Sequence, residues 1–309
     1  MASVEVSPAD SGFVKVCGFN IYYESHGDSD NVMLCLHGGP GATHGYLTSL
    51  SKIAGPDLRV VMYDQLACGR SERTSDLSLF NIERAAEEIE NLRTQLNLGE
   101  INLLGQSYGG FLALQYALKH QQHIRKLILS NTAASIPRTV EEMQRLRAQL
   151  PAESRTILDK YEALGDLQNP EYLSAMMLLY KRHLCLVDPW PPLVEQIFST
   201  LNTDIYWHMW GPNEFNVTGN LRYWNVVPRL STIKCPTLII TGEHDELTPD
   251  LSLEMQKEIS DSKLVIFRGG SHLLMFEQEQ KYLSVISEFL RGKFPKVSFY
   301  VSDKMFLNN

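Results

Sequence analysis

The sequence predicts an α/β protein with a mostly parallel central sheet, flanking helices and an inserted all-helical cap. Three observations support this prediction. Short apolar runs alternate with helical patterns over residues 13–134, and strand patterns return after Pro228. A Gly-x-Ser-x-Gly segment, residues 105–109, joins one of those runs to an Ala- and Leu-rich helical pattern. Residues 139–201 contain helical patterns but no convincing strand.

The expected strands are short apolar segments bounded by turn residues. They cover residues 32–36, 59–63, 101–104, 126–130, 236–242 and 264–267. Helices are expected over residues 82–96 and 110–120, and an amphipathic helix over 278–290 ends the pattern. This alternation is typical of βαβ units, whose parallel strands all end at one edge of the sheet.

The segment Gly105-Gln106-Ser107-Tyr108-Gly109 lies between an expected strand and an expected helix. A strand that turns sharply into a helix forces the central residue into a cramped backbone, and small flanking residues avoid clashes. The serine hydroxyl is then exposed at the carboxyl edge of the sheet. Glycine and serine also cluster in ordinary turns, so the alternative is a plain turn serine. The strand–turn–helix context favours Ser107 as a nucleophile and predicts the α/β-hydrolase fold.

A serine nucleophile needs a base, and the base needs a carboxylate to orient it. In this fold both follow the serine, the acid before the histidine. Asp245 comes just after the expected strand 236–242, and His272 just after 264–267. The alternatives are a helix cap or acidic turn for Asp245 and a surface loop for His272. His244 is a weaker candidate base, because it precedes the acid and does not follow the last strand.

A glycine-rich loop, His37-Gly38-Gly39-Pro40-Gly41, follows the first apolar strand. Such a loop can direct main-chain N–H groups at a developing oxyanion, together with the N–H of the residue after the nucleophile. We therefore expect oxyanion donors at Gly38 or Gly39 and at Tyr108. An ordinary Gly/Pro turn is the alternative, but one expected strand separates this loop from Ser107, as the hydrolase fold requires.

Helical patterns dominate the segment that separates the first strands from the last two. One begins at Asn169-Pro170, where a side-chain cap precedes proline at the first helical position. We expect residues 1–134 and 229–309 to form the catalytic domain and residues 135–228 to form a helical cap over its active site. The stripe from Met176 to Tyr180 could line a substrate pocket, although such stripes more often belong to the core.

The composition excludes several classes of function. With 309 residues, the chain is long enough for one α/β domain and an insertion. Hydrophobic and charged contents of 44% and 21% are typical of soluble globular proteins. The net charge of −8, without a basic run, argues against nucleic acid or an anionic membrane as a partner. The sequence has no apolar stretch of about 18 residues, so no transmembrane helix is expected. Residues 1–12 lack the basic and apolar parts of a signal peptide.

Five cysteines are spread along the chain: Cys17, Cys35, Cys68, Cys185 and Cys235. Their odd number and the absence of metal-ligand spacing predict reduced, buried thiols in a cytoplasmic protein without a bound metal. A serine, a histidine and an aspartate are sufficient for the expected chemistry, so no cofactor is expected either.

Four segments resemble the proline iminopeptidases, the α/β-hydrolase aminopeptidases that remove an N-terminal residue, and look most like their archaeal tricorn-interacting type. The similarity extends over residues 13–293. The four segments are His37–Gly41, Asp64–Ser71, Gly105–Gly110 and Gly211-Pro212-Asn213-Glu214-Phe215. The Gly-x-Ser-x-Gly motif occurs in many hydrolases, whereas the Gly-Gly-Pro-Gly loop and the Gly-Pro-Asn-Glu-Phe segment are more specific.

The resemblance implies a catalytic triad of Ser107, Asp245 and His272, and two acids, Glu214 and Glu246, that hold the free α-ammonium of the substrate. Carboxylates suit this task because they form charge-assisted hydrogen bonds with a buried cation. From the residues alone, each glutamate has the alternative of a solvated surface acid. The implied substrates are short peptides or aminoacyl amides, with a functional link to a larger protease that produces the peptides.

Several positions depart from the pattern of many bacterial members. Tyr108 stands where tryptophan is common, Asn131-Thr132 replaces an Arg-Gly pair, and Ala67 replaces a glycine. Strict preference for N-terminal proline is therefore open, and an amino-acid amidase or a small-molecule esterase of the same fold is the alternative. A ligand receptor or scaffold with vestigial catalysis is a third hypothesis, which the complete set of site residues disfavours.

Overall fold

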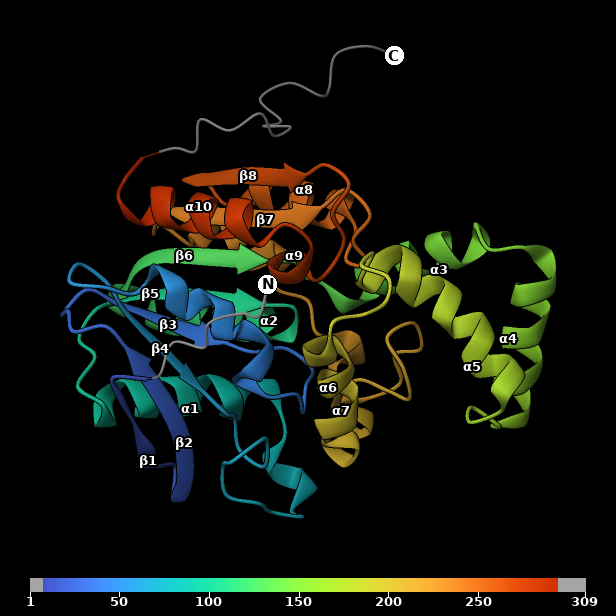
Figure 1. The fold of residues 1–309 in the computed structure, drawn as a ribbon, viewed down its shortest axis with the longest axis horizontal. Helices are drawn as coiled ribbons and strands as arrows, with labels where there is room; N and C mark the ends of the chain where they lie inside the picture. Colours follow the sequence, from blue (N-terminus) through green and yellow to red (C-terminus); the bar gives the residue numbers. More distant parts are fainter. Residues whose placement is uncertain (1–7, 294–309) are drawn as a thin grey trace, which may run out of the picture.

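Eight strands form a single sheet in the computed structural model, which describes residues 8–293 (Figure 1). The strand order is β1-β2-β4-β3-β5-β6-β7-β8. The hairpin of β1 (Asp10–Val16) and β2 (Phe19–His26) is antiparallel, and β2 is also antiparallel to β4. All other neighbours are parallel, which confirms the predicted mostly parallel sheet. The end of the predicted catalytic domain, residues 294–309, lies outside the described residues.

The remaining strands lie where the apolar runs predict them. They are β3 (Val32–Leu36), β4 (Arg59–Tyr63), β5 (Ile101–Gln106), β6 (Ile124–Ser130), β7 (Thr237–Gly242) and β8 (Ser262–Phe267). Every residue of β3, β5 and β7 is buried, as expected for parallel strands with helices on both faces. Consecutive side chains point to opposite faces, so Leu103 belongs to one apolar cluster and Leu104 to the other.

Helices cover both faces of the sheet. One face packs against α1 (Ile82–Gln95), α2 (Tyr108–His120) and α8 (Pro249–Glu258), and the other against the 3₁₀ segment η1 (His44–Ile53) and α10 (Glu279–Leu290). Shorter turns complete the connections: η2 (Leu77–Leu79), η3 (Gln121–His123) and α9 (Leu274–Glu277). The sequence patterns predict neither η1 nor α8, because helices of this length give a weak periodic signal.

The segment between β6 and β7, residues 131–236, contains helices and no strand of the sheet; we call it the insert. It comprises α3 (Ile136–Ala148), α4 (Ala152–Leu164), α5 (Pro170–Leu179), the π-helical turn η4 (Tyr180–Leu184), α6 (Pro192–Thr200), α7 (Thr203–Met209), η5 (Asn220–Tyr223) and η6 (Val227–Thr232). Asn169 caps α5 and Pro170 begins it, as predicted. Figure 1 shows α6 and α7 beyond the arrowheads of the central strands, and α3 to α5 further out.

Main-chain hydrogen bonds close the base of the insert. The N–H of Val226 donates to the carbonyl oxygen of Ala134 at 2.8 Å, and the N–H of Ile136 donates to that of Trp224 at 2.9 Å. This short antiparallel pairing brings the two ends of the insert together. Because β6 and β7 are parallel neighbours, the chain leaves the sheet at the carboxyl end of β6, and η6 leads it back to the amino end of β7 at the opposite edge.

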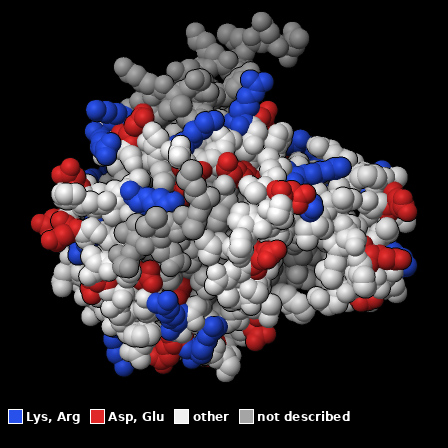
Figure 2. Space-filling model, in the orientation of Figure 1, with Lys and Arg blue, Asp and Glu red and all other residues white. Residues whose placement is uncertain are grey.

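Positive and negative side chains are interspersed on the face shown in Figure 2, where neither sign forms a continuous patch. That face therefore offers no basic track for a phosphate backbone. Within residues 8–293, no helix is both long enough and apolar enough to cross a lipid bilayer.

Candidate active site

Ser107 lies at the sharp turn between β5 and α2. Its backbone has a φ of 57° and a ψ of −126°, a conformation that residues other than glycine rarely adopt. A Cβ at Gly105 would lie 2.2 Å from the carbonyl oxygen of Gly109, and a Cβ at Gly109 would lie 2.1 Å from that of Leu36. The two glycines of the motif are therefore a steric requirement of this turn. Ser107 itself is half-buried at the carboxyl edge of the sheet.

Asp245 and His272 form a buried hydrogen-bonded pair. The Nδ1 atom of His272 lies 2.8 Å from Oδ1 of Asp245, and both residues are at most 3% exposed. Asn131 (2.7 Å) and Thr241 (3.1 Å) donate to Oδ2, and the N–H of Leu247 donates to Oδ1 at 2.9 Å. Four groups thus fix the carboxylate, which binds Nδ1 and leaves Nε2 of the imidazole for other contacts.

Asn131 and Thr132, a departure from the family pattern in the sequence, support the site directly. Asn131 binds Asp245 and also donates to the carbonyl oxygen of Ser271 at 3.0 Å. Thr132 donates to the carbonyl oxygen of Ser107 at 2.8 Å. Both residues directly follow β6, so their position after a strand end is the signal that could have identified them.

A hydrogen-bond chain links the glycine-rich loop, the nucleophile turn and the histidine loop. The N–H of Gly38 donates to the hydroxyl of Tyr46 at 2.6 Å, and this hydroxyl donates to Oε1 of Gln106 at 2.6 Å. The side-chain amide of Gln106 then donates to the carbonyl oxygen of His272 at 3.3 Å. Tyr46 and Gln106 therefore hold three loops of the site in one arrangement, although neither was singled out from the sequence.

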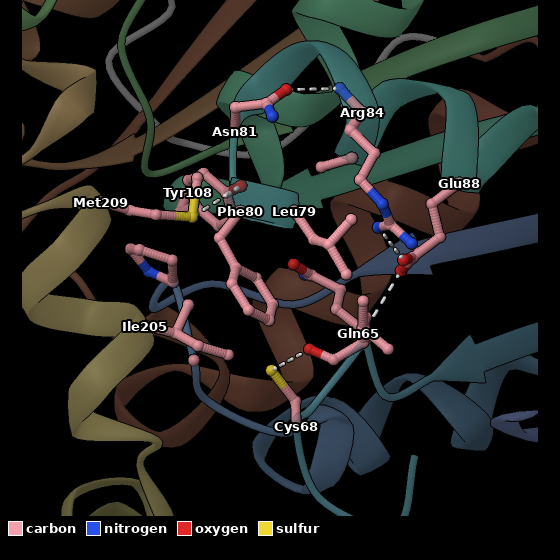
Figure 3. A pocket seen from close by; sticks show the side chains of 14 residues that line it. Gln65, Cys68, Leu79, Phe80, Asn81, Arg84, Glu88, Tyr108, Ile205 and Met209 are labelled. Atoms are coloured by element: carbon pink, nitrogen blue, oxygen red, sulfur yellow. Dashed lines mark hydrogen bonds and ion pairs between the residues drawn. The ribbon is translucent and has the colours of Figure 1, made fainter. Parts of the chain in front are cut away.

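The predicted oxyanion donors are Gly38, Gly39 and Tyr108. The N–H of Gly38 already donates to the hydroxyl of Tyr46, so Gly39 and Tyr108 stay as the predicted oxyanion donors. Tyr108 is the first residue of α2, and the first N–H groups of a helix have no intrahelical acceptor. Its side chain lines the cavity shown in Figure 3, where the hydroxyl contacts Sδ of Met209 at 3.8 Å.

The cavity of Figure 3 is too small for a peptide. It encloses about 20 Å³, which is room for about one water molecule. Arg84 and Glu88 form an ion pair of 3.0 Å on its polar side, and Glu88 also accepts the N–H of Leu66 at 3.2 Å. We therefore assign this cavity to packing beside the glycine-rich loop and not to substrate binding.

Glu214 and Glu246 come from different parts of the chain, the insert and the loop after β7. Glu246 is 2% exposed; its Oε1 lies 3.7 Å from Nε2 of His272, and its Oε2 has no hydrogen-bond partner in the described part of the chain. Burial raises the pKa of Glu246 well above its usual range; His272 opposes the rise, whereas Glu214 and Asp245 add to it. Burial also raises the pKa of Glu214, against the hydroxyl of Tyr206 and the charge of His272.

Three carboxylates act on His272. Burial by itself lowers the pKa of this imidazole, but Asp245 and Glu246, and more weakly Glu214, outweigh burial and raise the pKa to about 9. The site therefore concentrates negative charge around one imidazole. Such a site suits a ligand that carries a positive charge.

The insert contacts the loops that carry the candidate catalytic residues. The carbonyl oxygen of His183, in the π-helical turn η4, accepts the N–H groups of Glu246 and His272, each at 3.2 Å. The N–H of Asn202 donates to the carbonyl oxygen of Gly41 in the glycine-rich loop at 2.8 Å. π-Helical turns are frequent at functional sites. The insert thus holds these loops and also carries Glu214.

His244, the weaker candidate base, lies apart from the pair. Its side chain is 50% exposed, with Nε2 3.9 Å from the carboxylate of Glu243. Its carbonyl oxygen contacts Nδ1 of His183 at 2.9 Å. His244 is therefore a surface residue of this loop and not a partner of Asp245.

The Met176–Tyr180 stripe divides between core and site. Met176 is 2% exposed and belongs to the apolar core, whereas Met177 is 36% exposed. The ring of Tyr180 lies 6.2 Å from that of Phe215, and burial and the charge of Glu214 raise the pKa of Tyr180. Tyr180 is thus the member of the stripe that reaches the acidic residues.

The cysteines and the group of three potential metal ligands found among the described residues lie outside this set of residues. All five cysteines are free; four are buried, but Cys17 is exposed, contrary to the prediction, because it lies in the turn between β1 and β2. Elsewhere, Glu90, His120 and His123 bring three potential metal ligands together. Arg93 donates to both carboxylate oxygens of Glu90, at 2.9 and 2.7 Å, so this group is better explained as an ion-pair network.

Comparisons with known proteins agree with this geometry. A family model described as alpha/beta hydrolase fold matches residues 31–279. The chain is 42% identical over 285 residues to a proline iminopeptidase of Saccharolobus solfataricus, covering 91% of this chain and 92% of the relative. It is 38% identical over 290 residues to a proline iminopeptidase of Thermoplasma volcanium, covering 93% and 98%.

Solved structures give the same result. The crystal structure of VinJ is 34% identical, with a TM-score of 0.86 over 92% of this chain and 99% of that one. The crystal structure of a Mycobacterium smegmatis proline iminopeptidase is 32% identical, with a TM-score of 0.84 over 92% and 98%. The chain therefore belongs to the proline iminopeptidase family of α/β hydrolases.

Proposed function

We propose that this protein is a serine aminopeptidase that releases N-terminal proline, and other N-terminal residues, from short peptides through an acyl-enzyme. The observation that carries the proposal is the pair of acids next to His272. Glu246 is buried and has one oxygen without a hydrogen-bond partner among residues 8–293, and the half-buried Glu214 reaches the site from the insert. Buried acids of this kind need a cation, and a substrate with a free N-terminus supplies one.

Recognition and chemistry are then adjacent. The substrate's ammonium binds Glu214 and Glu246, which places the first peptide bond beside Ser107. A substrate without a free amine leaves the acids unpaired. Its binding free energy is then less favourable by several kcal/mol, because each charged hydrogen bond contributes about 1.5–3 kcal/mol. The N-terminal residue is thus selected by its charge as well as by its shape.

Acylation uses the histidine and the main-chain donors. The hydroxyl oxygen of Ser107 attacks the carbonyl carbon while Nε2 of His272 takes its proton, and Asp245 stabilises the resulting imidazolium. The N–H groups of Gly39 and Tyr108 receive the oxyanion. His272 then returns the proton to the leaving amine, the peptide bond breaks, and the shortened peptide departs.

Deacylation repeats these steps with water. His272 takes a proton from a water molecule, which attacks the acyl carbon, and the proton then goes to the oxygen of Ser107. The free amino acid is released and the enzyme is restored. Both reaction steps use, besides substrate and water, only side chains and main-chain groups of the protein.

The acidic pair decides between this proposal and the alternatives. An esterase has no need for two acids near its histidine, and the esterases among the solved structures, such as that of Exiguobacterium antarcticum, are 21% identical and share the fold alone. An amino-acid amidase shares the need for a free amine and differs only in the leaving group. The link to a peptide-producing protease and the cytoplasmic location stay predictions.

A panel of aminoacyl-β-naphthylamides tests the proposal. We expect hydrolysis of the prolyl compound with a free amine, and a kcat/KM at least about tenfold lower for its N-acetyl counterpart, from the loss of charged hydrogen bonds. Alanyl and leucyl compounds measure the strictness for proline. Equal rates on free and acetylated substrates would contradict the aminopeptidase and favour the esterase.

A further inference from the structure

Both nitrogens of His272 face carboxylates. Nδ1 lies 2.8 Å from Asp245, and Nε2 lies 3.7 Å from Oε1 of Glu246. All three residues are at most 3% exposed, so water screens these interactions little. An imidazole between two ionised carboxylates is favoured in its doubly protonated, charged form, and that imidazolium in turn opposes the rise that burial causes in the pKa of Glu246.

This arrangement conflicts with the role of a general base. The base must accept the proton of Ser107 at Nε2, and an imidazolium already carries a proton there. Before a substrate binds, Glu246 therefore stabilises the form of His272 that cannot activate the serine. Some event in the cycle has to remove that proton.

We propose that binding of the substrate's own ammonium group removes this proton. The ammonium pairs with Glu246 and replaces the imidazolium as the partner of that carboxylate, and His272 then releases its Nε2 proton to solvent. The inference rests on the proposed function, since it needs a substrate with a free amine. The charges balance, because one cation enters the site and one proton leaves it. Glu246 thereby controls the protonation state of His272 and also binds the substrate.

The other groups around His272 agree with an exchange of one cation for another. Asp245 and Glu246 lie on the loop after β7, and Glu214 reaches the site from the insert. The carbonyl oxygen of His183 accepts the N–H groups of Glu246 and His272. Burial lowers the pKa of the His183 ring, which disfavours a positive charge on this neighbour. The Oε2 atom of Glu246, which has no hydrogen-bond partner in the part of the chain that the structure describes, provides the acceptor for the ammonium.

The size of the effect is sufficient to change the enzyme's activity at neutral pH. Burial lowers the pKa of His272, but Asp245 and Glu246 outweigh burial and raise it to about 9. An opposite charge within a few ångström raises a pKa by roughly 1 to 3 pH units, and neutralising it removes that contribution. The pKa of His272 in the complex then falls to roughly 6 to 8, close to the working pH of a general base. A neutral substrate causes no such fall, so selectivity for free amines appears in kcat as well as in KM.

The pH profile of a neutral ester tests the pairing of His272 with Glu246 without any amine. We expect p-nitrophenyl acetate hydrolysis by the unmodified enzyme to rise towards pH 9. In Glu246→Gln the rising limb should move down by roughly 1 to 3 pH units, with a gain of about tenfold or more at pH 7. Glu243→Gln removes the same charge from an exposed position of the same loop and should leave the profile in place. An unmoved limb, or a loss of ester hydrolysis at every pH, would overturn the proposal.

Proton release by the unmodified enzyme provides a second measurement, independent of any variant. L-prolinol carries the amine but no scissile bond, and its binding can be followed by calorimetry at pH 7.5 in buffers of different ionisation enthalpy. We expect release of on the order of one proton for each prolinol bound. Binding without proton release would overturn the proposal. If prolinol does not bind, the amine site of the proposed function fails, and the ester profile alone still decides whether Glu246 controls His272.

Discussion

The sheet and the insert differ in how their residues are held, and they contribute different things to the site. Every residue of β5, which leads to Ser107, is buried, and the carboxylate of Asp245 is fixed by four donors. The insert carries large apolar side chains in solvent, such as Leu164 at 67% and Trp207 at 56% exposure. Fewer buried contacts imply lower local stability and easier adjustment.

This difference separates bond cleavage from recognition. The sheet region fixes the reacting groups, which have to keep their geometry to within a fraction of an ångström. In the proposed function the insert supplies Glu214, whose carboxylate contacts the hydroxyl of Tyr206 and binds the substrate's ammonium group from a less rigid support. Substitutions in the two regions should therefore have different signatures.

The largest effect is expected in the sheet region, from Ser107→Ala and His272→Ala. Each should lower kcat by at least about 10⁴-fold, because nucleophile and base act as one unit. The double variant should be little worse than either single one. Steady-state assays with prolyl-β-naphthylamide measure the loss, with protein fold checked by circular dichroism.

His244→Ala is the matched control for His272. The residue lies one position before Asp245 and has a half-exposed side chain. We expect a kcat within about threefold of the unmodified enzyme, as is usual for a surface residue. A larger loss here than in His272→Ala would contradict the assignment of the base.

The next largest effect concerns stability and pH, and it also belongs to the sheet region. His44 lies 2.8 Å from Asp64 and 3.4 Å from Glu24. Burial lowers the pKa of His44, but the hydrogen bonds and charges of these two acids outweigh burial and raise the pKa to about 9. Because the folded pKa lies above the unfolded value, the stabilisation is complete below about pH 6.5 and disappears as the pH rises through 9.

The free energy of unfolding should therefore fall between pH 6.5 and 9.5, by on the order of 3 kcal/mol from His44 alone. His272, whose pKa is also raised to about 9, adds a decrease of the same sign. Urea unfolding of the enzyme and of His44→Gln at both pH values separates the two contributions. An equal pH dependence in the variant would show that His44 is not charged in the folded protein.

A smaller and more selective effect is expected in the insert. Glu214→Gln keeps the shape of the side chain but removes its charge, so kcat/KM should fall roughly ten- to a hundred-fold on substrates with a free amine. Hydrolysis of p-nitrophenyl acetate should not fall, because the ester does not use the ammonium site and Glu214 makes only a weak contribution to the raised pKa of His272. Equal losses on both substrates would mean that Glu214 supports the fold and would remove the distinction between the two regions.

The smallest effect is expected from Thr241→Val, which removes one of the donors to Asp245 without changing the volume of the side chain. The loss of one hydrogen bond of 3.1 Å in a set of four should lower kcat by about two- to tenfold. KM should stay constant, since Thr241 touches no substrate group. A change confined to KM would show that the residue acts on binding and not on the orientation of the acid.

Strands and catalytic turns were predictable because their signals are local. The apolar runs 32–36 and 59–63 agree with β3 and β4 at both ends, since strands buried on both faces contain little else. Ser107, Asp245 and His272 each follow a strand, which the topology brings to one edge. The position of Asn131 after a strand end marks it as a candidate, but its partner, like those of Tyr46 and Gln106, was not predictable, because the partners lie far away in the sequence and follow no motif. Asn131 and Asp245 are 114 residues apart, and Tyr46 and Gln106 are 60 apart.

The paired base of the insert has a consequence for how this enzyme can change. The main-chain bonds between Ala134 and Val226 and between Ile136 and Trp224 bring together the two chain segments that enclose the helical residues 137–223 of the insert. A segment with adjacent ends can be replaced by another of different length without altering the order of strands in the sheet. Part of the proposed recognition site is thus carried by an exchangeable segment, and a chimaera joined at this pairing would acquire new selectivity if the new segment also supplies the contacts that His183 and Asn202 make with the catalytic loops.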